Sequence, residues 1–158
     1  MANITMQSAD SLSAKMAECF VTIDGDRYNF FNMIDFEAKL EKTKSTVPIL
    51  GQMSAGNRST GAEGTFSGTL HYNQSFMRQM MLDYLHTGKD VYFEIQVTNE
   101  DPTTSVGRQT VVFTGCNLDS LIMAKFDADG EYLDEEFEGT FEDCNMPEAF
   151  AELSGIRG

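Results

Sequence analysis

Two histidines and one acidic motif are the residues of this sequence with the clearest capacity for chemistry. A histidine can act as a general acid or base, but neither His71 nor His86 lies near a recognisable serine or cysteine nucleophile motif. His71 falls on the polar side of a predicted strand. His86 falls in the last turn of a predicted helix, where positive charge is favourable. We therefore interpret both histidines as structural.

The segment Asp127-Ala-Asp-Gly130 has the composition of a calcium-binding loop. Aligning Gly130 with the invariant glycine of an EF-hand would put Lys125 at the first ligand position, and lysine cannot bind calcium. The same residues suit an Asp-Gly hairpin turn. The acidic run over residues 134–138 alternates with aromatic and small residues, so most of its carboxylates are expected on the wet face of a strand.

The three cysteines are Cys19, Cys116 and Cys144. Their number is odd, their spacing is wide and no Cys-x-x-Cys pair occurs, so neither a zinc site nor a redox dithiol is indicated. We expect buried, reduced thiols. Together with the missing nucleophile motifs, this predicts a protein with no metal, no cofactor and no enzymatic activity.

The charge balance excludes one large class of function. The 158 residues include 25 Asp and Glu against 11 Lys and Arg, a formal net charge of −14. A protein that grips nucleic acid through its phosphates needs a basic face, and adsorption to anionic lipid needs one too. No apolar run approaches the roughly 20 residues of a membrane span, so we expect no membrane anchor. The length and the 41% hydrophobic content predict one folded domain over residues 1–158.

Period-2 alternation dominates the chain and predicts strands. Asp24-Gly25 is a hairpin turn between residues 20–23 and 27–30. A long strand is predicted over residues 32–46, with Ile34, Phe36, Ala38 and Leu40 on a buried side and Asp35, Glu37, Lys39 and Glu41 on a wet side. Further strands are expected over residues 65–72, 90–98, 108–113 and 132–141.

One helix is predicted over residues 75–87, with an apolar stripe that belongs to the core. Helix and strands together predict a mainly β, antiparallel sandwich or barrel with one flanking helix. Residues 1–15 are polar and predict a flexible arm. Residues 51–64 contain four glycines and predict a long loop with a role in assembly.

Several blocks of the chain resemble a known family. They are Gly64–Asn73, Thr87–Pro102, Gly107–Val111, Cys116–Asp119, Ala124–Ala128 and Thr140–Asp143. These blocks are similar to the XkdM-like phage tail tube proteins of contractile phages, PBSX-type defective phages and R-type bacteriocins.

The resemblance implies a tail-tube fold that assembles into hexameric rings, which stack into a tube inside a contractile sheath. It implies baseplate or tube-initiator and tape-measure proteins as further partners, and a virion or tail-like particle assembled in the cytoplasm of the host bacterium. DNA would pass through the lumen of a phage tube without being bound, whereas a bacteriocin tube would pass ions.

Two sets of site residues follow as hypotheses. Alternation along residues 32–46 suggests a lumen-facing set consisting of Asp35, Glu37, Lys39 and Glu41. The glycine-rich segment suggests contacts between subunits or rings made by Gly51, Gln52, Met53, Asn57, Arg58, Gly61 and Glu63. Two alternatives stay open: the tube protein of a related contractile secretion system, and a monomeric acidic β-barrel that binds a ligand.

Overall fold

The computed structural model describes residues 5–157. These residues contain eight strands and one α-helix, and all the strand pairs with a determined register are antiparallel. The predicted mainly β class with one helix is confirmed. The chain forms two compact units: unit 1 lies within residues 1–31, 93–114 and 144–158, and unit 2 within residues 32–92 and 115–143. The prediction of a single domain stays a prediction.

Unit 1 is built on strand β1 (Ala17–Ile23), which pairs with β2 (Asp26–Asn29) on one side and β5 (Phe93–Glu100) on the other. The turn between β1 and β2 is the predicted one, with Asp24 at φ 49° and Gly25 at φ 86°. Strand β8 (Asp143–Glu148), which was not predicted, pairs with β6 (Arg108–Leu121). The buried apolar side chains of this unit are Val21, Ile23, Phe30, Phe93, Ile95, Val106 and Phe113.

Hydrogen bonds join residues 10–13 to the rest of unit 1. A short 3₁₀ helix, η1, covers Ser8–Asp10. The Asp10 carboxylate accepts the N–H of Ser105 at 2.9 Å, and this hydrogen bond lowers the pKa of Asp10. The N–H of Ser13 donates to Asp101 at 2.9 Å and lowers the pKa of that carboxyl in the same way. The predicted flexibility of residues 1–15 stays a prediction, and residues 1–4 lie outside the described residues.

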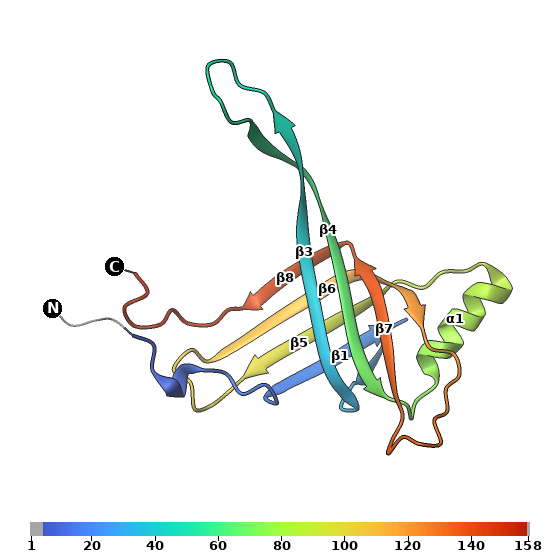
Figure 1. Ribbon diagram of the computed structural model, residues 1–158. Helices are drawn as coiled ribbons and strands as arrows, with labels where there is room; N and C mark the ends of the chain where they lie inside the picture. The colour runs from blue at the N-terminus through green and yellow to red at the C-terminus, as the bar shows by residue number, and fades with distance from the viewer. Residues whose placement is uncertain (1–4, 158) are drawn as a thin grey trace. The chain divides into compact units, whose positions relative to one another are not determined.

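Unit 2 contains a long hairpin of β3 (Met33–Val47) and β4 (Gly56–His71). Strand β7 (Asp134–Phe141) pairs with β4 only over residues 64–71, and the end of β6 pairs with β7. The part of the hairpin beyond Glu41 and Glu63 is therefore a ribbon of two strands. Figure 1 shows this ribbon standing clear of β7.

The glycine-rich segment corrects the sequence-based expectation. Residues 51–64 were predicted as a loop, but from Gly56 onward they form β4, and the connection between the strands covers only residues 48–55. Gly56 and Gly61 pair with Val47 and Thr43 on the opposite strand. The prediction failed because backbone pairing with a long partner strand overrides the low β-propensity of glycine.

Helix α1 (Phe76–Thr87) was predicted almost to the residue, and it ends at Gly88 with φ 73°. Its apolar stripe was predicted to be core, which is wrong for the second half of the helix. Met77 is buried, but Tyr84 is 53% and Leu85 is 73% exposed. The side of β3 that was predicted to be buried is also partly exposed, since Leu40 is 60% exposed.

The core of unit 2 is organised by glycines that face phenylalanine rings across the β4–β7 pair. There are three such cross-strand pairs, and the glycine comes alternately from β4 and from β7: Gly64 with Phe141, Phe66 with Gly139, and Gly68 with Phe137. A Cβ at Gly68 would lie 2.7 Å from Phe137, and one at Gly139 would lie 2.7 Å from Phe66 and would overlap the carbonyl oxygen of Asn117. The rings occupy the space that larger residues would need, so this register admits only glycine at these positions.

We predict that Gly139→Ala destabilises the protein by about 2 to 3 kcal/mol, because the added methyl overlaps a backbone oxygen that cannot move independently. The matched control is Gly61→Ala, because a Cβ at Gly61 meets nothing within 4 Å. The measurement is urea unfolding of both variants. Equal urea midpoints for Gly139→Ala and Gly61→Ala would show that the phenylalanine rings do not fix the register of β4 against β7.

Candidate functional site

The outward face of unit 2 carries polar side chains in register across three strands. Asp35 of β3 lies opposite Thr69 of β4, which lies opposite Glu136 of β7. In the next row the order is Glu37, Ser67 and Glu138. Each of these two rows has a hydroxyl between two carboxylates. A third row joins Lys39, Thr65 and Thr140. We call these three rows, together with Glu41 beyond them, the acidic face.

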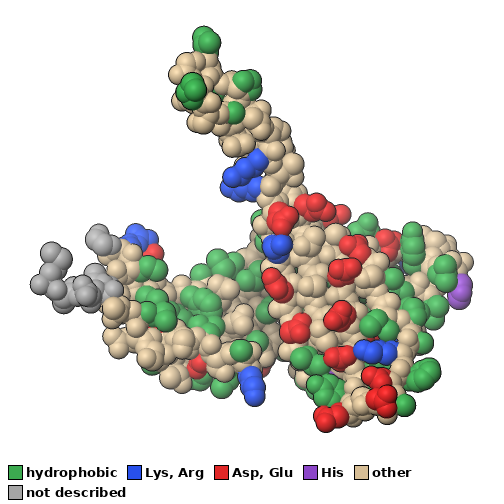
Figure 2. All heavy atoms as spheres, in the orientation of Figure 1, with side chains coloured by type: hydrophobic (Ala, Val, Ile, Leu, Met, Phe, Trp, Pro, Cys, Tyr) green, Lys and Arg blue, Asp and Glu red, His purple; other side chains and the backbone are tan. Residues whose placement is uncertain are grey.

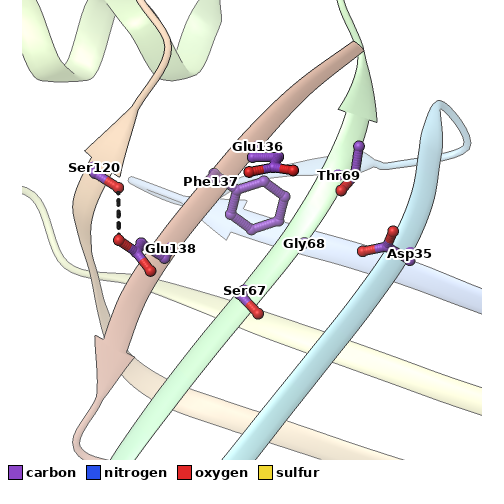
Figure 3. Close-up of a pocket in the computed structure, with 8 residues that line it drawn as sticks. All are labelled: Asp35, Ser67, Gly68, Thr69, Ser120, Glu136, Phe137 and Glu138. Carbon is purple, nitrogen blue, oxygen red and sulfur yellow. Dashed lines mark hydrogen bonds between the residues drawn. The ribbon is translucent and has the colours of Figure 1, made fainter.

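The acidic face is largely exposed and slightly hollowed. Five of its residues, with Ser120, Gly68 and Phe137, line a depression of about 320 Å³. Figure 3 shows Ser67 and Thr69 lying between Asp35 and the two glutamates of β7. The Oγ of Ser120 lies 3.1 Å from Glu138, and Nζ of Lys39 lies 3.0 Å from Glu41. The hydrogen bond to Glu41 raises the pKa of Lys39.

One acidic residue of the same strand is turned inward. Glu135 is 2% exposed, and its carboxylate accepts a hydrogen bond from Arg78 of α1. Arg78 also donates to the Gln74 carbonyl, and its guanidinium lies 4.4 Å from the centre of the Tyr72 ring. Burial raises the pKa of Glu135, although Arg78 acts in the opposite direction. This ion pair fastens α1 to β7 and compensates the charge on the core side of the strand.

The hypothesised lumen residues do share one exposed face, since Asp35, Glu37, Lys39 and Glu41 are all exposed on β3. Their orientation toward a lumen stays a prediction. Sequence reasoning placed most of the run 134–138 on a wet face but did not place Glu136 and Glu138 in this set. Their alternation was the available signal, but which strand lies next to β4 cannot be read from the sequence.

The predicted assembly residues divide between two parts of the hairpin. Gly51, Gln52 and Met53 lie in the connection between the strands, whereas Asn57, Arg58, Gly61 and Glu63 lie on β4. Except for Gly56, every residue from 39 to 63 is exposed. Figure 2 shows basic side chains along this ribbon and hydrophobic ones at its end. Their contact with another subunit stays a prediction.

Other kinds of site find little support within residues 5–157. No group of three His, Cys, Asp or Glu there is placed to hold a metal ion. In the same range no helix is long and apolar enough to cross a membrane. Cys116 is fully buried as expected, whereas Cys19 and Cys144 are only half-buried, so the expectation of three buried thiols is wrong for these two. Burial raises the pKa of Cys19 to about 12, so this thiol is a poor nucleophile.

Comparison with known proteins gives these surfaces a context. Residues 4–148 match the family described as phage tail tube protein. This chain belongs to the phage tail tube protein family. The tail tube protein is 34% identical over 149 residues to XkdM of the phage-like element PBSX of Bacillus subtilis strain 168, an alignment that covers 94% of this chain and 99% of XkdM. The sequence resemblance to tail tube proteins is confirmed. Because this family is structural, the protein is not an enzyme.

Solved structures show the same fold at low sequence identity. A chain of the sheath–tube complex of the extracellular contractile injection system PVC, in its extended state, has a TM-score of 0.64 at 10% identity and covers 94% of this chain and 99% of its own length. A chain of the anti-feeding prophage baseplate has a TM-score of 0.63 at 11% identity, with 92% and 97% covered. These likenesses establish the tail-tube fold.

We predict that Arg78→Met destabilises the tail tube protein by about 3 kcal/mol or more at pH 8, because it leaves the buried Glu135 without a partner. The loss becomes smaller near pH 4, where Glu135 takes up a proton more readily. Adding Glu135→Leu restores most of the stability. The matched control is Arg108→Met, which breaks the exposed pair with Glu148 and changes stability little. Thermal unfolding at the two pH values checks this, and a loss independent of pH contradicts it.

Proposed function

We propose that this protein forms the inner tube of a contractile phage tail or of a tail-like particle such as a bacteriocin, by stacking hexameric rings around a lumen. The observation that carries the proposal is the β3–β4 hairpin. Strand β3 is the last strand in the order of its sheet and extends over 15 residues. Long edge strands are an aggregation hazard in a monomer unless they are paired or protected. A ring in which each β3 pairs with a neighbouring subunit uses this edge.

The composition of the acidic face supports a role as the wall of a lumen. All its outward side chains are acids, hydroxyls or one lysine, and no aliphatic side chain interrupts the three rows. A surface of this kind repels phosphates at close range, so DNA passes along it without sticking. In a bacteriocin the same lining favours cations. Sequence and structure therefore support transport through the tube rather than binding inside it.

Partners follow from what the relatives assemble with. One structural relative is part of a sheath–tube complex and another belongs to a baseplate. By analogy we propose that this tube contacts a sheath protein outside, a baseplate or tube initiator at one end, and a tape-measure protein inside during assembly. The particle forms in the cytoplasm of the host bacterium. A second candidate is the tube of a contractile injection system, which the likeness to the PVC chain favours.

We predict that replacing residues 42–62 by Asn-Gly gives a folded protein that does not form tubes. Glu41 and Glu63 are directly paired, so a two-residue turn can close the shortened hairpin. Circular dichroism and negative-stain electron microscopy measure folding and assembly. The control is the Asn57→Ser variant, which keeps the full hairpin and should form tubes. Normal tubes from the shortened protein would contradict an assembly role of the hairpin.

The orientation of the acidic face is tested by cryo-electron microscopy of the assembled tube. We expect Asp35, Glu37, Glu136 and Glu138 to line the bore of every ring. The proposal is wrong if this face is buried between subunits or turned toward the sheath.

A further inference from the structure

The outer part of the hairpin, residues 42–62, has the opposite charge from the rest of the protein. We call this segment the arm. It contains Lys42, Lys44 and Arg58 and no acidic residue, so all 25 acids lie elsewhere with the other eight basic residues. Among the described residues no carboxylate forms an ion pair with the three cations of the arm. The arm is therefore a basic projection on an acidic protein.

The end of the arm is apolar as well as basic. Leu50 and Met53 are as exposed as in an extended chain, at 104% and 106%, and Ile49 is 44% exposed. Pro48 closes the strand before them. Apolar side chains held this far from the core gain stability only when another surface covers them. The charge and the tip together specify a partner surface that is acidic and contains exposed apolar side chains.

One surface of unit 2 has this combination. Residues 123–132 are all exposed, and they include Phe126 at 91% and Tyr132 at 66% exposure. Asp127, Asp129 and Glu131 lie between the two aromatic residues. In the described residues no ion pair reaches these three acids, whereas the neighbouring Lys125 is held by Asp134 at 3.1 Å. We call residues 126–132 the aromatic–acidic loop. The acidic face is a poorer match, because its rows offer no apolar side chain to cover Leu50 and Met53.

The arm and the loop lie at opposite ends of the same strand. The arm is at the start of β4, whereas His71 at the end of β4 pairs with Asp134, the first residue of β7 after the loop. His71 also contacts the Tyr132 ring, with centroids 5.6 Å apart. Fifteen strand residues separate the two ends, a distance on the order of 50 Å. One copy cannot join them, but a second copy placed head to tail can.

We infer that the arm of one subunit docks on the aromatic–acidic loop of another copy of this chain in the next ring. The cations of the arm pair with Asp129 and Glu131, and Leu50 and Met53 pack against Phe126 and Tyr132. A contact between two different surfaces leaves a free arm at one end and a free loop at the other, so it repeats along the strand direction and adds ring upon ring. This inference rests on the proposed tube function and specifies the surface that the hairpin contacts.

Charge reversal in two full-length variants tests the pairing. The arm variant carries Lys44→Glu and Arg58→Glu, and the loop variant carries Asp129→Lys and Glu131→Lys. All four residues are exposed, and Asp127 is kept because its carboxylate accepts the N–H of Asp129 at 3.1 Å. In either variant alone, the arm and the loop carry charge of the same sign, so the arm of one copy repels the loop of the next. In a mixture, each arm meets a loop of opposite charge on the other variant, so the two proteins alternate along the tube.

The readout is the protein concentration at which tubes form, measured by sedimentation and electron microscopy at low salt. Each variant alone should need a concentration at least about tenfold higher than the wild-type protein, and the equimolar mixture should return close to the wild-type value. Unchanged thermal unfolding shows that the variants are folded. The control mixes the arm variant with an Asp35→Lys, Glu37→Lys variant, whose arm and loop are both unchanged; the arm variant should stay in the supernatant and not enter the tubes that this second variant forms.

The outcomes separate this inference from the proposed function. If the wild-type protein forms tubes and each single variant assembles equally well, the docking of arm on loop is wrong and the tube function stands. The same conclusion follows if the wild-type protein forms tubes but the mixture of the two variants does not assemble. A wild-type protein that stays monomeric at every concentration and salt overturns both.

Discussion

The interleaving of glycines and phenylalanines between β4 and β7 is the constraint on which the rest of unit 2 depends. Each of the three pairs puts a ring where a side chain on the opposite strand would otherwise project. Phe66 lies at the centre, stacked on Phe36 of β3 at 6.2 Å and tilted against Phe137 at 6.1 Å. Because side chains alternate between the faces of a sheet, fixing this register on the inside fixes the partners on the outside. The same strand pairing therefore brings Asp35, Glu37, Glu136 and Glu138 together in rows on the outer face.

The acidic side chains of β7 are likewise divided between the inner and the outer face of the sheet. Glu135 is the acid of β7 that falls on the inner side, and it is accommodated because Arg78 reaches it from α1. The acids on the outer side need no such partner, since water solvates them. A face made of carboxylates and hydroxyls is costly to cover with protein and inexpensive to expose to water. The physical properties of this face therefore agree with a surface that remains wet after assembly.

The hairpin has the opposite properties. Its outer half has no third strand, its side chains are exposed and its end carries Leu50 and Met53. Within a monomer this segment adds little burial and exposes backbone along both edges. Unpaired strand edges and exposed apolar side chains of this kind are features that proteins usually cover or protect. The exposed half of α1 and Leu40 of β3 are further surfaces that the isolated chain leaves uncovered.

The amino-acid sequence by itself determined the class of fold, the Asp24–Gly25 turn, helix α1 with its glycine cap, the long strand β3 and membership of the tail tube family. These features depend on local periodicity, on backbone preferences and on blocks of residues that can be compared directly. Only the tertiary structure decided that residues 56–64 are strand, that Glu136 and Glu138 lie in register with Asp35 and Glu37, and that the stripe of α1 is half exposed. Each of these depends on which strand lies beside which and on where the sheet ends. Those are contacts between residues far apart in the chain, and no local pattern contains them.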